Sequence, residues 1–473
     1  MKKNTNAMER ILKYNGDPSM KMTIATIITL ALPAIIEQMM ITMVQYVDTA
    51  MVGSLGSNAT AAVGLTASTT WLVGGILNAA AIGFSVQVAQ LIGAGKLDRA
   101  RSVIGQSVQF IFIFGGMIGI IAFAVSYPLP MLLGADKAIR GDASLYFRII
   151  ACSVPFNFCS LMLSSIIRCS GDTRTPMILN MSINVINVIL NFLFIYPTRE
   201  LSLFGYDFTM FGAGMGVAGA AFGSFLSLFS VSVMFLLVLY CKRSDIRIKF
   251  GRFYRFEKGV LISAWKLGLP VALERSLTCI AQIIITSIIT SVGTVAVAAN
   301  HLAVTAESLS YMPAYGLSAA GTAMVGQAMG AKRLDLAKKF SRITTYIGVI
   351  IMTVGGVLLY ILAPDLIRIF SNEAEVISLG TSVLRIVAFA EPCFAMAIVI
   401  TGILRGAGDT KAPFLISLAT MWGIRITISL LLSKPLGLVG IWLAMAIELC
   451  ARGILFMIRL YRNKWLEIKL IND

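Results

Sequence analysis

The sequence predicts an all-α polytopic membrane protein, with twelve transmembrane helices in two pseudo-symmetric six-helix lobes. Three observations predict this fold. The 473 residues are 57% hydrophobic and only 13% charged, whereas soluble proteins carry about 25% charged residues. Long apolar runs recur along the whole chain, and the second half repeats motifs of the first. A soluble protein of several domains is therefore excluded.

The composition also excludes most enzyme classes. The chain has one His and seven scattered Cys, which give neither a zinc-ligand spacing nor a C-x-x-C motif. Few of the segments between apolar runs are long enough to fold into a catalytic domain. We expect no enzymatic activity, no metal centre and no cofactor other than a coupling ion.

The spanning segments follow from their length and polarity. A helix needs about 20 mainly apolar residues to cross a bilayer, and twelve stretches meet this condition. They lie at residues 23–49, 60–83, 103–126, 145–166, 177–197, 217–240, 262–290, 296–325, 343–363, 380–403, 413–432 and 438–458.

The basic residues predict the orientation, because Lys and Arg are enriched in cytoplasmic loops. With the N-terminus inside, most of the 39 Lys and Arg residues lie in cytoplasmic segments. The outer loops then hold only Lys137, Arg140, Arg199, Arg368 and Lys434. We expect a multi-pass protein of the plasma (inner) membrane with both termini in the cytoplasm. We expect the basic residues that give the net charge of +16 to interact with anionic lipid headgroups and not with nucleic acid.

The two halves of the chain are repeats of each other. RCSGDTRTP at 168–176 recurs as RGAGDTKAP at 405–413, and LALPAIIEQ at 30–38 recurs as LGLPVALER at 267–275, both at an offset of 237. After the fifth span the offset falls to 221, so the first half carries a 16-residue insertion in an outer loop. Six spans per repeat place both lobes the same way up, with a cavity between them. We expect a cytoplasmic tail at 1–22, an N-lobe at 23–240, a basic linker at 241–261, a C-lobe at 262–460 and a second tail at 461–473.

Two short motifs occur once in each repeat. In GDT(R/K)xP, the Gly ends one helix with a positive φ, the Asp and Thr cap the next helix, and the Pro suits its first turn. The motif therefore predicts a tight helical turn and not a phosphate loop, which would need a preceding strand. The Q-x-x-G-A motif, in QLIGAGKLDRA at 90–100 and QAMGAKRLDLA at 327–337, predicts the end of a span followed by a short turn.

Polar residues inside a span are costly and indicate a functional site. Asp48 lies towards the outer end of the first span, and its repeat equivalent is Ile285. In the fifth span Asn184, Asn187 and Asn191 form one stripe at i, i+3 and i+7, and its second-half equivalents are Met421, Ile424 and Ile428. Both features belong to the first half alone. We expect Asp48, Asn187 and Asn191 to bind a coupling ion, H⁺ or Na⁺.

Other polar residues are candidates for lining the cavity between the lobes. Glu37 lies eleven residues before Asp48, about 20° from the same helix face, with Gln45 alongside. Glu274, the repeat equivalent of Glu37, forms a stripe with Thr278 and Gln282 at i, i+4 and i+8. A structural role for the two glutamates, paired with Arg275 or with backbone near the prolines, is equally open. The cavity candidates are Glu37, Gln45, Asn184, Glu274, Thr278 and Gln282.

We expect Arg425 in the eleventh span and Glu448 in the twelfth to form a structural ion pair. Glu391, beside Pro392, fits either a structural or a functional role. His301 is more typical of a satisfied polar residue than of a ligand.

These features together resemble the multidrug and toxic compound extrusion (MATE) family, over residues 20 to 460. The resemblance rests on VDTAMVGSLG (47–56), the paired Q-x-x-G-A segments, the paired GDT motifs, and MWGIRI (421–426) followed by GLVGIWLA (437–444). It implies two six-helix lobes that open alternately and export cationic, amphipathic drugs in exchange for H⁺ or Na⁺.

The family's acidic residue of the first span matches Asp48, and its Asn–Asp pair of the fifth span matches Asn187 and Asn191. The second position has thus lost its carboxylate here. The sodium-coupled branch has a carboxylate where this chain has Thr278, so its second-lobe sodium site does not carry over.

We therefore expect a monomeric cation-coupled drug antiporter, with small cationic amphipathic drugs and the lipid bilayer as its partners. The main alternative is a flippase of the same superfamily for a lipid-linked oligosaccharide or another lipid. A flippase for a lipid-linked oligosaccharide would line its cleft with Arg or Lys for a pyrophosphate. A prenyl transferase would need paired aspartate motifs, which are missing. A passive channel would leave the asymmetry between the halves unexplained.

Overall fold

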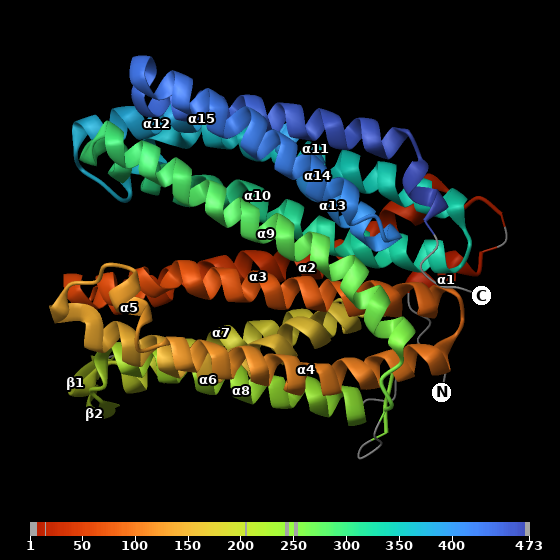
Figure 1. Cartoon of the computed structure of the whole chain (residues 1–473), viewed down its shortest axis with the longest axis horizontal. Helices are drawn as coiled ribbons and strands as arrows, with labels where there is room; N and C mark the ends of the chain where they lie inside the picture. Colours follow the sequence, from red (N-terminus) through yellow and green to blue (C-terminus); the bar gives the residue numbers. More distant parts are fainter. Residues whose placement is uncertain (1–6, 15, 204–205, 242–245, 250–253, 469–473) are drawn as a thin grey trace.

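The computed structural model describes residues 7–14, 16–203, 206–241, 246–249 and 254–468. Its helices form two packed groups, drawn one above the other in Figure 1. The N-lobe comprises α2 (Met20–Gly53), α3 (Ser57–Gly93), α4 (Leu97–Val125), α5 (Leu129–Leu132), α6 (Lys137–Cys169), α7 (Arg174–Phe194) and α8 (Gly216–Cys241). The C-lobe comprises α9 (Lys258–Val292), α10 (Thr294–Gly330), α11 (Leu334–Arg368), α12 (Ala374–Ala388), α13 (Glu391–Ala407), α14 (Lys411–Thr420), the π-helical η1 (Met421–Ile426) and α15 (Thr427–Tyr461). A short α1 (Ala7–Leu12) and a 3-10 turn η2 (Lys464–Glu467) lie at the two ends.

All twelve predicted spans lie in helical segments of the structure. Fewer of these helices, taken one by one, are long and apolar enough to cross a membrane. Among the described residues, nine helices are long and apolar enough to cross a membrane, and the bent pair α12 and α13 makes a tenth. The helical stretch Lys411–Tyr461 counts once, but the chain turns back within it at Gly437, which has φ 57° and ψ −135°. The remaining span is α10, whose 37 residues include a buried Glu307 and many small side chains. The expected fold class is confirmed.

The loop motifs form the turns that the sequence predicts. Gly171 and Gly408 adopt positive φ angles of 91° and 96°. Asp172 Oδ1 accepts a hydrogen bond from the backbone N–H of Thr175 at 3.0 Å, and Asp409 Oδ1 accepts one from Ala412 at 3.2 Å. Each GDT motif therefore ends one helix and caps the next through its Asp, as expected. Thr173 and Thr410 occupy the N-cap positions, but their side chains form no capping hydrogen bond, so this part of the prediction is wrong.

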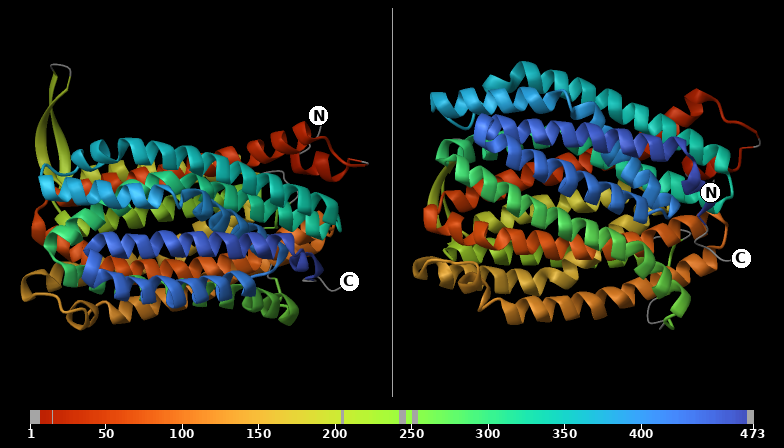
Figure 2. Two further views of the ribbon diagram at one scale, coloured as in Figure 1. Left: turned by 90° about the horizontal axis from the view of Figure 1, so that it is seen from above. Right: turned by 45° about the horizontal axis from the view of Figure 1, so that its top comes forward.

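The 16-residue insertion forms a β-hairpin, which the sequence analysis does not predict. Strands β1 (Pro197–Leu203) and β2 (Tyr206–Ala213) pair antiparallel and stand out from one end of the helices in the left view of Figure 2. We call this end of the molecule the hairpin face. The opposite end, where the chain termini lie in Figure 1, is called the terminal face.

The lobes are in contact on the terminal side. Residues 83–91 of α3 and 323–328 of α10 are buried. Nearer the hairpin face, Trp71 of α3 and Val304 of α10 are 60% and 42% exposed. Contact between these two helices is therefore concentrated towards the terminal face.

The hydrophobic core of each lobe includes residues from the segment that precedes the other lobe in the chain. The linker residues Ile246 and Ile248 pack with α3, α4 and α6 of the N-lobe. Met8 and Ile11 of α1 pack with α10, α11 and α13 of the C-lobe. The linker was predicted to end at residue 261, but α9 already begins at Lys258. Linker residues 242–245 and 250–253 lie outside the described part. The predicted tail 1–22 already contains α1 and the start of α2.

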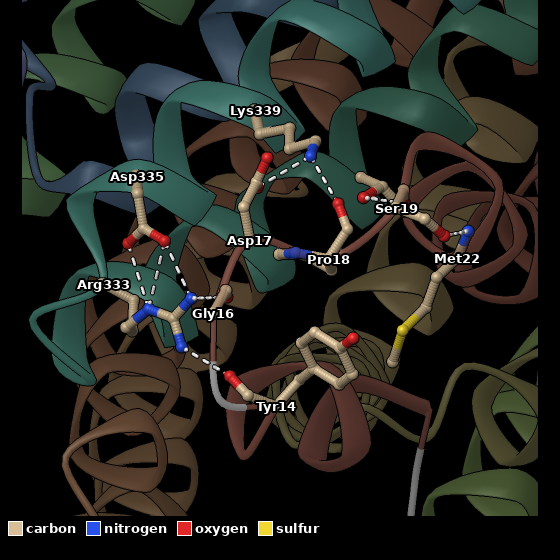
Figure 3. A network of polar contacts seen from close by, with 10 residues as sticks. Tyr14, Gly16, Asp17, Pro18, Ser19, Met22, Arg333, Asp335 and Lys339 are labelled. Atoms are coloured by element: carbon tan, nitrogen blue, oxygen red, sulfur yellow. Dashed lines mark hydrogen bonds and ion pairs between the residues drawn. The ribbon is translucent and has the colours of Figure 1, made fainter.

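The N-terminal strap, residues 7–14 and 16–19, is held on α11 by polar contacts as well (Figure 3). Arg333, fixed by Asp335, donates to backbone carbonyls of the strap. Lys339 pairs with Asp17 at 2.8 Å. The carbonyl acceptors of Arg333 are Leu12, Tyr14 and Gly16. The start of α2 is therefore anchored to the C-lobe.

We expect Arg333→Ala to loosen the strap, because three backbone carbonyls lose their cationic donor. Each lost hydrogen bond contributes about 1 kcal/mol to holding the strap in place. Amide hydrogen exchange over residues 8–19 should therefore accelerate roughly tenfold or more. Hydrogen exchange with mass spectrometry measures this. The control is Lys96→Ala, which changes the repeat equivalent of Arg333 at the start of α4. Unchanged exchange in Arg333→Ala would show that apolar packing alone holds the strap.

Candidate functional site

The two carboxylates of α2 point to different partners inside the N-lobe. Asp48 lies on the hairpin side and contacts α7, whereas Glu37 lies on the terminal side of Asp48 and contacts α6 and α7. The two side chains therefore occupy separate polar clusters, although they share one helix.

The Asp48 cluster joins three residues that the sequence analysis selected. Asn191 Nδ2 donates to Asp48 Oδ1 at 2.9 Å. The Asn187 amide satisfies its neighbours when its nitrogen faces the carboxylate, and it then donates to Oδ1 at 2.7 Å and to Oδ2 at 3.2 Å. In this orientation its oxygen accepts from Ser224 Oγ at 3.2 Å. Two amides thus hold one carboxylate in a fixed position.

Local sequence explains how this cluster fits between α2, α7 and α8. Asn187 and Asn191 are one helical turn apart on α7 and are 4% and 1% exposed. Gly223 of α8 makes room for them, because a Cβ at this position would lie 2.3 Å from Asn191 Oδ1. That Oδ1 atom is buried without a hydrogen-bond partner, as is the Asn184 Nδ2 atom one turn before Asn187. The Asn191 amide therefore turns its nitrogen to Asp48 and its oxygen to Gly223, and the carboxylate is the group of this cluster that can bind a proton or a cation.

The second lobe has no equivalent of this cluster. Ile285, the repeat equivalent of Asp48, is 2% exposed and packs with Met421 in the C-lobe core. The equivalents of Asn187 and Asn191 are Ile424 and Ile428. The polar cluster is therefore a feature of the N-lobe alone, as the sequence predicts. The side chain of Gln45 lies outside the described part, and only its place on α2 is known.

Glu37 is a buried ion-pair partner and not a cavity-lining residue. Its Oε1 atom accepts from Arg168 Nη2 at 2.7 Å and from Asn180 Nδ2 at 2.6 Å, and the residue is 2% exposed. The suggested pairing with Arg275 is wrong for Glu37. The partner is the first residue of the RCSGDTRTP motif, which the sequence analysis interpreted only as part of a turn.

The C-lobe repeats this arrangement. Glu274 pairs with Arg405 at 2.9 Å and accepts from Ser417 Oγ at 3.1 Å. All three residues are offset by 237 from Glu37, Arg168 and Asn180. The constant offset among three polar residues was the signal that could have revealed both triads from sequence.

Among the cavity candidates whose side chains the structure describes, Glu274 and Thr278 lie together. They line a small pocket between α9, α14 and η1, with Leu277, Phe414, Ser417, Leu418, Met421 and Trp422. Thr278 Oγ1 donates to the Glu274 carbonyl at 2.7 Å, so its hydroxyl is used within its own helix. Gln282 is exposed and is not among the residues of this pocket.

Arg425 and Glu448 do not form the direct ion pair that the sequence predicts, although their charges attract each other. Glu448 pairs with Arg452 one turn later on α15, with Nε and Oε1 2.6 Å apart. Arg425 instead donates to Met445 Sδ at 3.1 Å. Arg425 lies in the π-helical turn η1. Met445 is three residues before Glu448 on α15, so Arg425 contacts the predicted face of this helix one turn away from the predicted residue.

The C-lobe also buries Glu307 and Glu391, which are 2% and 0% exposed. Both oxygens of Glu391 and one oxygen of Glu307 have no hydrogen-bond partner. Glu391 begins α13 beside Gly356 of α11, where a Cβ would lie 3.2 Å from the Glu391 Cβ.

The chain matches a known protein family and several known proteins. The profile of the MatE family matches residues 33–193 and 270–431, one segment in each lobe, with starts 237 residues apart. The probable multidrug resistance protein NorM of Thermotoga maritima is 29% identical over 445 residues, which cover 93% of this chain and 92% of that protein. The multidrug resistance protein MdtK of Yersinia pestis is 24% identical, covering 93% and 95%.

A solved structure shares the fold. It is described as the outward-facing conformation of a multidrug resistance MATE family transporter of the MOP superfamily. It superposes with a TM-score of 0.87 over 98% of this chain and 100% of that chain, at 21% sequence identity. The two-lobed arrangement is therefore common to both chains.

Proposed function

The chain belongs to the MatE family of multi-pass membrane transporters, and we propose that it exports small cationic, amphipathic compounds in exchange for inward H⁺ or Na⁺. The observation that supports this most directly is the Asp48 cluster. It is a single carboxylate inside the N-lobe, held in position by the amides of Asn187 and Asn191.

One carboxylate is sufficient to couple an ion to a drug. When Asp48 is ionised, it attracts a cationic drug, and when it has bound H⁺ or Na⁺, that attraction is lost. Coupling requires that ion and drug differ in their affinity for the two states of the protein. Mutual exclusion at Asp48, combined with alternate opening of the lobes, meets this requirement.

We place the terminal face in the cytoplasm and the hairpin face outside the plasma membrane. The support is the excess of Lys and Arg in segments at the terminal face. With this orientation, the contact of the lobes near the terminal face corresponds to a state closed to the cytoplasm. Asp48 lies on the side that receives ions from outside. We propose a monomer as the working unit.

The test is transport by the purified chain in proteoliposomes loaded with a fluorescent cationic dye such as ethidium. A proton gradient and a sodium gradient are imposed separately, and dye movement is followed by fluorescence. We expect one gradient to drive dye export, which identifies the coupling ion. If neither gradient moves the dye, antiport of cationic compounds is wrong, and movement of labelled phospholipid or polyprenyl pyrophosphate between leaflets becomes the next assay.

A further inference from the structure

The two Q-x-x-G-A segments, from opposite halves of the chain, meet at the terminal face. Gln90 and Gly93 lie in the last turn of α3, and Gln327 and Gly330 lie in the last turn of α10. We name the contact of these four residues the glutamine–glycine clasp. The proposed transport mechanism does not use this motif.

Each glutamine of the clasp forms hydrogen bonds across the boundary between the lobes. Gln327 Nε2 donates to the Cys169 carbonyl at the end of α6, at 2.7 Å. Gln90 Nε2 donates to the carbonyls of Gly406 and Ala407 at the end of α13, both at 3.3 Å. The two side chains are 4% and 3% exposed. The carbonyls at the end of an α-helix have no hydrogen-bond partner within that helix. The two glutamine amides thus supply partners for such carbonyls at the ends of α6 and α13.

The two glycines of the clasp lie so close to the facing helix that there is no space for a side chain. A Cβ at Gly93 would lie 2.0 Å from the Gln327 carbonyl oxygen, and a Cβ at Gly330 would lie 1.9 Å from the Gln90 carbonyl oxygen. Real Cβ atoms do not approach so closely, and the obstacle is backbone that no side-chain rotation can move. Gly74, in the same helix α3 but nearer the hairpin face, has nothing within 4 Å of its Cβ position.

The surroundings of the clasp are also reciprocal. Ala89, Cys169 and Ala323 form a small buried cluster beside it, and a Cβ at Gly326 would lie 2.9 Å from the Ala89 Cβ. Gln90 is related to Gln327, and Gly93 to Gly330, by the offset of 237. Duplication of one segment has therefore produced a contact in which each copy binds the other lobe.

We propose that the glutamine–glycine clasp is the gate that closes the terminal face and that separates when the lobes open there. This inference rests on the proposed alternate opening of the lobes. Small residues let the backbones touch, and the polar bonds allow the contact to come apart. When the lobes separate, water replaces each carbonyl as a partner, so the net cost per hydrogen bond is only about 1 kcal/mol.

The experiment compares Gly93→Ala and Gly330→Ala with the control Gly74→Ala. An added methyl at either clasp glycine forces the helix ends apart, whereas the control methyl meets open space. We expect hydrogen exchange over residues 90–96 and 327–333 to accelerate about tenfold or more in both clasp variants and to remain at the wild-type rate in the control. Gradient-driven dye export should fall by a similar factor, because the closed state loses population.

A second variant guards against misfolding. Gln327→Leu keeps roughly the size of the side chain and removes the 2.7 Å bond, so it should accelerate exchange at the clasp several-fold while lowering the melting temperature by no more than a few degrees. Gln90→Leu should have the smaller effect, since its bonds are longer.

Two results would overturn the proposal. Wild-type exchange in both glycine variants would show that the backbones do not touch. Faster exchange with undiminished dye export would show that the contact exists but is not a gate. If the wild-type chain moves no dye, the proposed function fails instead, and the exchange measurements still report whether the clasp exists.

Discussion

Gradient-driven dye export is expected to fall about a hundredfold in Asp48→Asn, the magnitude of a coupling energy near 3 kcal/mol. Asparagine has nearly the shape of aspartate, and it still meets Asn187 and Asn191. It has no negative charge, however, and can neither bind a proton nor attract a cation. The variant therefore resembles permanently ion-bound protein and should fail to exchange ion for drug.

The measurement is dye efflux from proteoliposomes under whichever gradient drives the wild type. The matched control is Asp136→Asn, an acid that caps the start of α6 by accepting from Ala138 at 3.2 Å. Asparagine is an equally good cap, so the control should transport normally. Full activity of Asp48→Asn would remove Asp48 from the coupling site and leave the buried Glu307 and Glu391 of the C-lobe as the acids to test next.

Arg168→Ala is expected to destabilise the protein by about 3–5 kcal/mol, because it leaves the buried Glu37 carboxylate without its cation. Arg168 and Glu37 are 13% and 2% exposed, whereas the equivalent pair of Arg405 and Glu274 is 21% and 14% exposed. Water reaches the second pair more easily, so Arg405→Ala should cost clearly less. The two variants form a matched comparison within one chain.

Thermal unfolding in detergent, followed by intrinsic fluorescence or by binding of a thiol-reactive dye, measures the difference. The double variant Arg168→Met with Glu37→Gln should recover most of the lost stability, because it removes both charges together. Equal losses for Arg168→Ala and Arg405→Ala, or no recovery in the double variant, would contradict a buried ion pair as the cause.

Local pattern was sufficient to predict the helices and the polar cluster. Twenty apolar residues in a row must form a helix in a bilayer, since no water is available to the backbone. The stripe of Asn184, Asn187 and Asn191 lies on one face of α7 by helical geometry alone. Its meeting with Asp48 was predicted because both features occur only in the first half of the chain.

Pairings between helices were predicted less well. Glu37 was a candidate for the cavity or for a structural pair with Arg275 or nearby backbone, but it pairs with Arg168, which is 131 residues away in the chain. Glu448 was assigned to Arg425, but it pairs with Arg452 on its own helix, and Arg425 donates to Met445 one turn earlier. Periodicity predicts the face of a helix, whereas packing decides which residue of that face a neighbour contacts.

The sequence by itself determined the twelve spans, the duplication, the capped turns at the GDT motifs and the N-lobe residues around Asp48. Each of these depends on interactions within a few helical turns or on direct repetition of residues. Only the tertiary structure decided the partners of Glu37 and Glu448, the attachment of the N-terminal strap to α11, and the clasp between α3 and α10. These contacts depend on the rotation and axial position of whole helices, which packing fixes and which no local pattern of residues records.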